Sequence, residues 1–458
     1  MINEYEITEP GYIDAFDKEA FTEPQKEDTE GISGDGRAGI KIITHTSEFD
    51  ELEDEWTELA RESDTDVFQT YEWNRIWWDH FGQGKQLHIF TVYTEGCLAG
   101  IAPFFEDDVA LFGIKSYTCL RFLGSYVTQP EGKPLSGSIP YSDYLDCIIR
   151  PGLETVFYEQ LLHHFKEVLS SGHEIVLDEI PEESAILNTM IPLLGNKSQG
   201  LNCEIAEGSS SPVIQLCSSW DAYLKSLSVK DRYNARRYLK RSKKGKAIVF
   251  EVKKSNHPDE LTGLQEAFIR LHQQQWNNRG FSGTFSEQRM HNFFIDISTS
   301  FYEKQWLEFN YAVPADAHNQ IVAVDVLIKY KDKIYLLHRG LDENPLHKKK
   351  GPGNVLLYSR LNEAIYDGVK AFEMLRGSEE FKLRMATKIN RNKKIRIYPG
   401  SSARRLSSAL VKKYMKLTHH IRMEKSHVRL ILGNKPLFSG ISEYVQFLQG
   451  RIKHKFSN

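Results

Sequence analysis

Residues 338–382 read HRGLDENPLHKKKGPGNVLLYSRLNEAIYDGVKAFEMLRGSEEFK and carry more structural information than any other segment of the chain. A turn with the spacing Lys-x-x-Gly-x-Gly, from Lys348 to Gly353, precedes apolar residues that recur at helical spacing until Gly368, a natural helix stop. Backbone N–H groups in the first turn of a helix lack intrahelical partners, and glycine lets a phosphate approach them closely. The segment therefore predicts a phosphate-binding turn that opens a helix.

Paired strands are predicted directly before this segment and again in the first half of the chain. The run IVAVDVLIKYKDKIYLLHRG, residues 321–340, predicts two strands that meet at residues 331–333. The run LHIFTVYTEGCLAGIAPFFEDD, residues 87–108, predicts two strands joined around Glu95 and Gly96. Because both halves show the same order of elements, the chain is predicted to be α/β (α+β) and to contain a duplicated fold.

Composition divides the chain into four parts. Residues 1–36 hold 11 Asp or Glu against two Lys, which predicts a disordered tail, whereas residues 401–458 hold 12 Lys or Arg against two Glu. Ser, Gly and Asn gather at residues 196–212 and predict a boundary, after which residues 220–246 predict one long amphipathic helix with a basic end. The predicted parts are an acidic tail (1–39), an N-terminal domain (40–205), a C-terminal domain (206–400) and a basic helical segment (401–458).

Length and composition exclude several classes of protein. The chain has 458 residues, of which 40% are hydrophobic and 26% charged, as in a globular protein of two or three domains. No segment approaches the roughly 18 apolar residues of a membrane span, and the acidic start does not resemble a secretory signal, so we expect a cytoplasmic protein. Five cysteines without CxxC spacing predict neither a disulfide framework nor a zinc site.

The segment around the glycines resembles the acyl-CoA pyrophosphate loop of GNAT acyltransferases, R/Q-x-x-G-x-G/A, with Lys348 in place of Arg or Gln. The following VKAFEMLRGSEEFKLRM is similar to the next strand and turn of that family, and HQQQWNNRG to the end of the helix before the acceptor loop. In the first half, VFQTYEWNRIWWDHFG, LRFLGS and SDYLD resemble the first lobe of the BioF-like, cellulose-biosynthesis-associated (CelD/BcsL) branch. The resemblance covers roughly residues 65 to 390.

This resemblance implies tandem GNAT-like domains, each with a mixed, mostly antiparallel sheet flanked by helices, similar to Fem-type transferases. It implies that acyl-CoA, in the first place acetyl-CoA, is the co-substrate and that the acceptor lies between the lobes. Two neighbouring strands, with ends near His338 and Phe372, would splay apart to hold the thioester. The implied ligands of acyl-CoA are Lys348, Gly351, Gly353 and Asn354.

The implied chemistry is direct attack of an amine on the acyl carbonyl, which needs a proton acceptor and an oxyanion site. The candidate bases are Glu373 and Asp325, because a carboxylate in a partly desolvated cleft has a raised pKa. Arg376 and Lys382 are candidates to orient a carboxylate or phosphate of the acceptor. No metal is expected.

Structural alternatives exist for these residues. The alternatives are a plain turn for the two glycines, packing for Trp73, Trp77 and Trp78, a solvent-facing Asp325, an ion pair between Glu373 and Arg376, and a surface position for Lys382. The basic residues of 230–246 predict either a solvated helix face or a site for an anionic acceptor or nucleic acid.

Three functions follow from these observations. The first is an N-acyltransferase that uses acyl-CoA and acts on a small-molecule amine, an amino sugar or a polysaccharide precursor, with no nucleic-acid partner. The second is a Fem-like transferase that uses aminoacyl-tRNA, to which the basic residues of 230–246 would bind. The third is an inert GNAT-like module that binds a partner or a membrane surface through the basic segment 401–458.

Overall fold

The structure is a computed structural model that describes most of the chain between residues 38 and 399. The described ranges are 38–111, 114–125, 142–197, 201–242, 249–255, 257–316, 320–377 and 379–399. The predicted acidic tail and the predicted basic C-terminal segment lie outside these ranges, apart from residues 38 and 39.

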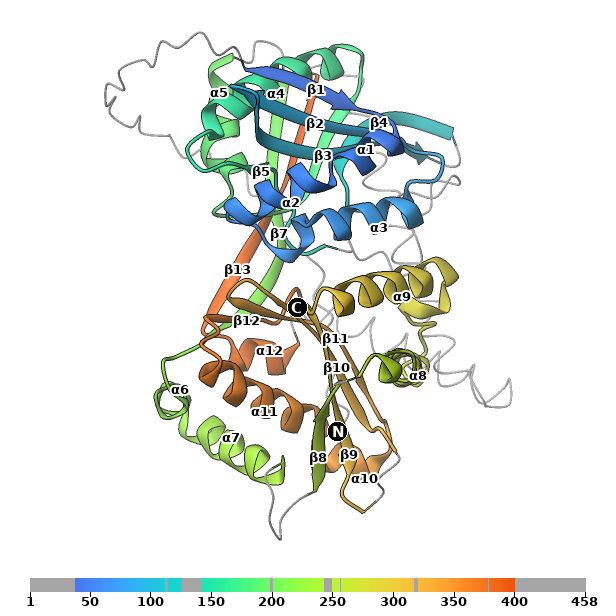
Figure 1. Ribbon diagram of the computed structural model, residues 1–458, viewed down its shortest axis with the longest axis vertical. Helices are drawn as coiled ribbons and strands as arrows, with labels where there is room; N and C mark the ends of the chain where they lie inside the picture. Colours follow the sequence, from blue (N-terminus) through green and yellow to red (C-terminus); the bar gives the residue numbers. More distant parts are fainter. Residues whose placement is uncertain are drawn as a thin grey trace, which may run out of the picture.

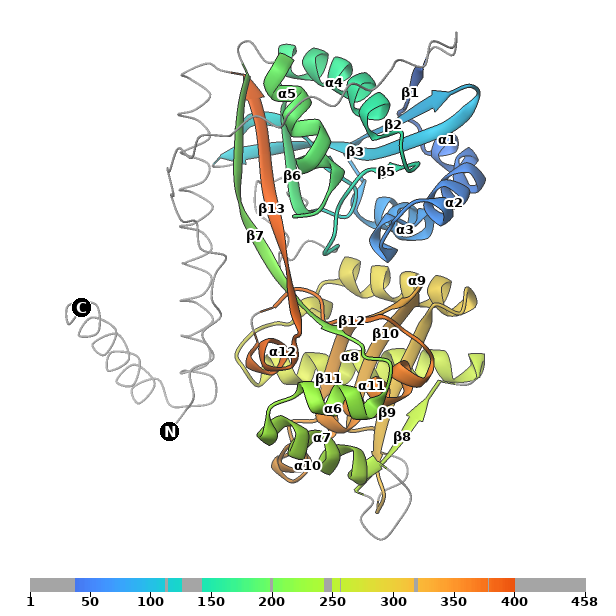
Figure 2. The same ribbon diagram turned by 90° about the vertical axis from the view of Figure 1, so that its left-hand side faces the viewer.

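A single sheet of 13 strands runs through both halves of the described chain (Figures 1 and 2). The first half contributes β1 (Gly39–Ile43), β2 (Gln86–Thr94), β3 (Cys97–Leu111), β4 (Ile114–Phe122), β5 (Ile148–Ile149) and β6 (Glu174–Pro181). The second half contributes β8 (Phe250–Lys254), β9 (Leu307–Pro314), β10 (Ala323–Tyr330), β11 (Lys333–Leu341) and β12 (Ala371–Glu373). Two long strands, β7 (Leu201–Gln215) and β13 (Lys388–Pro399), lie between the halves.

The strand order has the same sequence of elements on both sides of its centre. It is β1-β2-β3-β4-β6-β13 on one side and β8-β9-β10-β11-β12-β7 on the other, and β5 pairs with β3 off this path. In each half four strands pair antiparallel, and the fourth then pairs parallel with the next, β4 with β6 and β11 with β12. The predicted duplication and the predicted mixed, mostly antiparallel sheets are therefore confirmed. Both predicted hairpins are present as β2–β3 and β10–β11.

The two halves exchange their last strands. Strand β7 follows β6 in the chain but pairs with β12, and β13 follows β12 but pairs with β6. The two strands also pair with each other, from Lys388 opposite Val213 to Pro399 opposite Leu201. The Ser- and Gly-rich segment that suggested a linker is therefore strand from Leu201 onward, and the predicted boundary at 205/206 falls within β7. Pairing with a distant strand outweighs the local turn preference of these residues.

Helices cover both faces of the sheet. On one face, α1 (Thr46–Glu51), α2 (Glu53–Glu62) and α3 (Tyr71–Phe81) share a hydrophobic core with α8 (Leu261–Asn277) and α9 (Gln288–Glu303). On the other face, α4 (Glu154–Ser170) and α5 (Ile191–Lys197) pack on the first half. The second half carries there α6 (Trp220–Ser226), α7 (Val229–Ser242), α11 (Pro352–Tyr366) and α12 (Glu380–Met385), and α10 (Pro345–Lys350) precedes α11.

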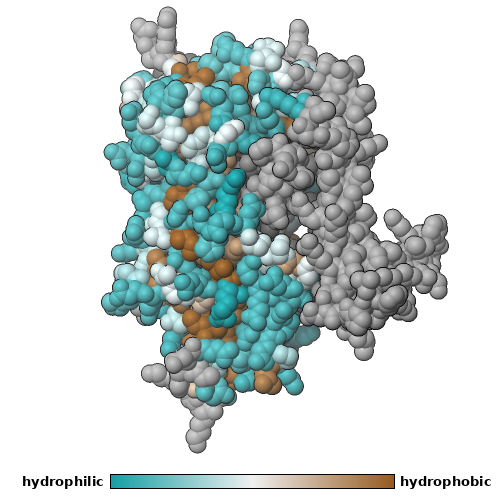
Figure 3. All heavy atoms as spheres, turned by 90° about the vertical axis from the view of Figure 1, so that its right-hand side faces the viewer, coloured by the Kyte–Doolittle hydropathy of each residue, from teal (hydrophilic) through white to brown (hydrophobic). Residues whose placement is uncertain are grey.

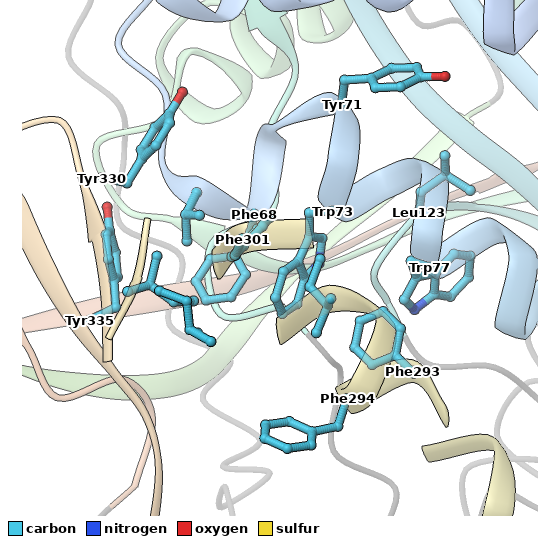
Figure 4. Packing of buried hydrophobic residues seen from close by; sticks show 14 of the residues in the cluster. Phe68, Tyr71, Trp73, Trp77, Leu123, Phe293, Phe294, Phe301, Tyr330 and Tyr335 are labelled. Atoms are coloured by element: carbon cyan, nitrogen blue, oxygen red, sulfur yellow. The ribbon is translucent and has the colours of Figure 1, made fainter. Parts of the chain in front are cut away.

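The halves also meet through aromatic packing between α3 and α9 (Figure 4). The ring of Trp73 lies edge-on to Phe293, with 5.5 Å between ring centres, and its indole N–H donates to Ser142 Oγ at 2.9 Å. Trp73 and Trp77 are both buried, which confirms their interpretation as core residues, and Trp78 is half-buried. Burial of large aromatic rings from both halves makes the halves one packed body.

The predicted long helix over 220–246 is wrong in one respect, because α6 and α7 are separate helices. Leu227 adopts an extended conformation with φ −80° and ψ 153°. The Ser228 hydroxyl accepts from the backbone N–H of Asp231 at 3.1 Å, as an N-terminal cap does. The predicted apolar face is confirmed, since Tyr223 and Leu224 are buried and Trp220 and Leu227 pack against the same hydrophobic core.

On the face shown in Figure 3, hydrophilic residues cover most of the coloured surface and hydrophobic residues reach it in small patches. Within the described part of the chain, none of the helices combines the length and the apolar character that a membrane crossing requires.

Gly208 gives a test of the strand exchange. A Cβ at this position would lie 2.8 Å from the backbone oxygen of Asn392 in β13, so Gly208→Ala forces the two exchanged strands apart. We expect the free energy of unfolding to fall by about 1–3 kcal/mol in urea titrations. The control is Gly263→Ala in α8, where a Cβ meets nothing within 4 Å and alanine should stabilise the helix by up to ~1 kcal/mol. Equal stabilities for the two variants would contradict close packing of β7 on β13.

Candidate functional site

The parallel strands β11 and β12 diverge after three residue pairs. Lys333, Ile334 and Tyr335 pair with Ala371, Phe372 and Glu373. Beyond them β11 continues along β10 to Leu341, whereas the chain after β12 turns toward β7, where Met374 N–H donates to the Pro212 carbonyl at 3.0 Å. The predicted divergence is thus present. It begins beyond Phe372, and β11 extends three residues past His338.

A β-bulge lies in β11 at the divergence. Val326 of β10 pairs with His338 and the adjacent Leu327 with Leu336, so Leu337 is the extra residue. A bulge interrupts the regular ladder and turns the strand locally. Because Leu337 is the extra residue, the side chains on either side of it still alternate between the two faces of the sheet in step with those of β10. His338 faces α8 and α9, and Arg339 faces α11.

The glycine turn opens α11 as predicted. Gly351 adopts the left-handed conformation with φ 71° and ψ 54°, and a Cβ there would lie 2.8 Å from the ring of Tyr238. Gly353 lies in the first turn of α11, where a Cβ would be 3.0 Å from Leu341 at the end of β11. The left-handed conformation thus favours glycine at 351, and a side chain at 353 would make a tight contact with Leu341. The helix ends at Tyr366, close to the predicted stop at Gly368.

The other two predicted ligands of this turn differ in their surroundings. Asn354 is half-buried in the first turn of α11. Lys348 belongs to α10, and its ammonium pairs with Glu343 at 2.7 Å. The turn therefore offers the backbone N–H of Gly353 at the helix start, since the N–H groups of Gly351 and Asn354 donate to the Lys348 and Gly351 carbonyls, together with a lysine that already has a carboxylate partner.

The structure places the two candidate bases on opposite faces of the sheet. Glu373 pairs with Tyr335, whose ring belongs to the core shared by the two halves, so Glu373 faces the first half. Asp325 pairs with Arg339 on the face that α11 covers. A substrate bound between the halves would therefore meet Glu373 and not Asp325.

Glu373 lies in a buried polar cluster built by both halves. Its side chain is 3% exposed and accepts a hydrogen bond from Tyr144 Oη of the first half at 2.8 Å. Beside it, Lys333 donates to Asp66 of the first half at 2.9 Å. Burial raises the pKa of Glu373 to about 7, against the hydrogen bond from Tyr144, and the Asp66 carboxylate raises it further. A carboxyl group that titrates near neutrality can accept and return a proton.

Asp325 is tied to the start of α11. It is 1% exposed, and both its oxygens accept hydrogen bonds from Arg339 at 2.6 Å, so the predicted alternative of a solvent-facing carboxylate is wrong. The Arg339 guanidinium lies 3.5 Å from the point that a Cβ of Gly353 would occupy, and it stacks on Phe381 at 5.6 Å. This bidentate pair holds β10, β11 and the helix start in register.

Arg376 and Lys382 close the turn after β12. Arg376 pairs with Asp143 of the first half, and no ion pair joins it to Glu373 in the described chain. Lys382 is not a surface lysine, because its side chain is 11% exposed and its ammonium donates to the Arg376 carbonyl at 2.7 Å. Burial lowers the pKa of Lys382. Glu373, Arg376 and Lys382 thus lie around one turn that contacts the first half.

Sequence reasoning missed the contribution of the first half to this site. Asp66, Asp143 and Tyr144 all contact residues of the second half, and Tyr144 belongs to the SDYLD segment quoted for its resemblance. That segment was the available signal, since a tyrosine between two aspartates in an apolar context is a candidate buried polar group. His338 faces an aromatic cluster in the second half, and burial lowers its pKa to about 3, so its ring stays neutral.

The described residues include no group of three His, Cys, Asp or Glu side chains arranged to hold a metal ion.

Comparison with known proteins identifies the second half. Residues 229–383 match the model of an acetyltransferase (GNAT) domain. No curated protein matches the chain. The crystal structure of FemX is 13% identical, with a TM-score of 0.51, and the match covers 78% of this chain and 96% of FemX. The structure of L-PGS from Bacillus licheniformis is 12% identical with a TM-score of 0.44, and the match covers 80% of this chain and 96% of L-PGS. A tandem GNAT protein from the clavulanic acid biosynthesis pathway is 10% identical with a TM-score of 0.38, and the match covers 80% of this chain and 99% of that protein. The second half therefore carries a GNAT domain, and the fold of the chain is similar to that of FemX over the 78% of its length that the match covers.

The pKa of Glu373 gives a test of this site through protein stability. The folded protein keeps this proton up to about pH 7, whereas the unfolded chain loses it near the usual 4.5. Burial of Glu373 therefore lowers the free energy of unfolding progressively as the pH rises from 4.5 to about 7, and it has no such effect below pH 4.5, where both states keep the proton. We expect Glu373→Gln to gain stability over the wild type by up to ~3 kcal/mol more at pH 8 than at pH 4. Urea unfolding of both proteins at the two pH values measures this. A pH-independent difference would show that the folded carboxyl group ionises normally.

Proposed function

We propose that the protein is an N-acyltransferase that transfers an acyl group, acetyl first of all, from acyl-CoA to the amine of a small molecule, an amino sugar or a polysaccharide precursor. One observation carries this proposal. Between two diverging parallel strands, β11 and β12, the chain places a helix that opens at a glycine turn, within the residues that match a GNAT domain.

The start of α11 fits the diphosphate of CoA. The backbone N–H of Gly353 in its first turn has no partner within the helix, and the helix dipole favours an anion there. The N–H of Asn354 donates to the Gly351 carbonyl at 3.1 Å. Gly351 and Gly353 keep side chains out of this approach. Bound acyl-CoA supplies the thioester that donates the acyl group. Asp325 supports this end of the site through Arg339, as a positioning residue.

The divergence of β11 and β12 leads from this helix to Glu373. Backbone N–H groups of β11 at the bulge are placed to stabilise the oxyanion that forms when the amine nitrogen attacks the acyl carbonyl. The new C–N bond forms as the C–S bond breaks, and Glu373 accepts the proton that the amine loses. The thiolate of CoA leaves and takes up a proton. Tyr144 and Arg376 bring the first half to the same place, so both halves would line the acceptor site.

The chemical class of the acceptor rests on the resemblance to the cellulose-associated branch, which favours a glycan precursor that carries an amine. Arg376 and Lys382 would orient an anionic group of that acceptor. In the structure Arg376 pairs with Asp143, and Lys382 donates to the Arg376 carbonyl, so both side chains lie at the turn that follows β12.

A second candidate, the Fem-like transferase that uses aminoacyl-tRNA, is favoured by the exposed cations of α7 and by the fold shared with FemX. CoA binding separates the two candidates.

Asn354→Asp tests the donor site. A carboxylate in the first turn stabilises the helix through its dipole but repels the diphosphate of CoA, so stability and binding should move in opposite directions. By calorimetry, acetyl-CoA should bind the wild type and bind the variant at least about tenfold more weakly, which is about 1.4 kcal/mol. The control is Asn292→Asp at an exposed position of α9, which keeps the hydrogen bond from Gln288 and adds the same charge on the opposite face of the sheet. No binding by folded wild type would overturn the acyl-CoA proposal.

Glu373→Gln tests the base. The amide keeps an acceptor for Tyr144 but cannot take a proton, so kcat should fall by about 10²–10⁴-fold while the Kd for acetyl-CoA stays unchanged. Release of free CoA thiol with a panel of amino sugars and small amines measures the rate. Glu55→Gln, which likewise keeps its hydrogen bond from a tyrosine, is the control. Full activity of the folded Glu373 variant would exclude it as the base.

A further inference from the structure

Helix α7 lies beside the start of α11. The ring of Tyr238 stacks on Tyr358 of α11, with 6.0 Å between ring centres and 11° between ring planes, and it touches Gly351. At the end of α7, the Arg241 guanidinium donates to the Lys350 carbonyl, just before the glycine turn. Helix α7 is thus fixed next to the proposed diphosphate site.

The solvent-exposed surface of α7 is cationic. Arg236, Arg237 and Lys240 are exposed, and none of them has a carboxylate partner in the described chain. Lys349 and Lys350 of α10 add two more cations without such partners. Clustered like charges repel one another, so a patch of this kind favours binding of a polyanion.

Two tyrosines hold part of this patch in place. The Arg237 guanidinium lies 4.8 Å from the ring centre of Tyr238 and 5.8 Å from that of Tyr233, which is 64% exposed. Arg241 lies 5.4 Å from the same Tyr238 ring. Guanidinium groups that stack on rings lose less freedom when they bind a phosphate, and the exposed ring of Tyr233 offers a flat surface to a base.

We propose that α7 and α10 form a subsite for the 3′-phosphorylated adenosine end of CoA, with Arg237 and Lys240 binding the 3′-phosphate. This inference rests on the proposed function. A diphosphate at the start of α11 leaves the ribose phosphate and the adenine to be placed. Arg237 lies close to that start, because it stacks on the Tyr238 ring that contacts Gly351, and Lys240 and the exposed ring of Tyr233 lie on the same helix. The basic residues of 230–246, predicted to serve either a solvated face or an anionic acceptor, would then serve the donor.

The test compares CoA with 3′-dephospho-CoA, which lacks this phosphate alone. Calorimetry on the full chain measures both ligands with wild type and with the double variant Arg237→Gln/Lys240→Gln. The wild type should bind CoA about tenfold or more tightly than dephospho-CoA, and the double variant should lose this preference while its affinity for dephospho-CoA is retained. Lys230→Gln, an exposed charge at the other end of α7, is the matched control and should keep the preference.

The outcomes separate this inference from the proposed function. Tight but equal binding of both ligands by wild type overturns the subsite and leaves the acyl-CoA transferase standing. Binding of neither ligand by folded wild type overturns both. Fluorescence anisotropy with a bulk tRNA is the further arm. Binding of tRNA that the double variant loses, together with equal affinities for CoA and dephospho-CoA, would assign the patch to nucleic acid and overturn the inference.

Discussion

The exchange of β7 and β13 between the halves is the constraint on which the rest of the structure depends. Each strand leaves the half in which it begins and completes the sheet of the other, so neither half can finish its sheet alone. This long-range pairing fixes the turn after β12 against the first half, where Tyr144 reaches Glu373. A buried carboxyl group without such a partner would be costly. The site is therefore a product of the way the two halves are joined.

The sheet also separates two tasks. On one face, Asp325 and Arg339 form a bidentate pair beneath the start of α11, which suits the support of a bound anion. On the other face, Glu373 titrates near neutrality among residues of both halves. The bulge at Leu337 lies between these functions, because it changes the direction of β11 where the strands diverge. Under the proposed function, donor binding and proton transfer could therefore be altered independently.

Local patterns in the sequence predict much of this fold, and long-range contacts explain what they miss. The hairpins at 87–108 and 321–340 and the helix after Gly351 follow from alternation, helical spacing and glycine conformation. The strand β7 does not, since its Ser and Gly residues favour turns and its pairing partner lies about 190 residues away in the chain. Glu373 was found through resemblance, but its partner Tyr144 belongs to the other half, which spacing along the chain cannot reveal. Residue type alone also could not place Asp325 and Glu373 on opposite faces.

The duplication raises the question of why a donor site should form in one half. In the first half, α4 is the counterpart of α11, but its start is acidic. Glu154 occupies the first turn, and its carboxylate accepts from the backbone N–H of Gly152 at 3.1 Å. A carboxylate at this place competes with a phosphate for the same dipole. Where β4 and β6 pair in parallel, Arg121 is buried between Asp107 and Asp178. The first half thus places its own charges at the positions that correspond to the proposed donor site. Under the proposed function, this difference would direct the donor to α11 and leave the first half to complete the acceptor side.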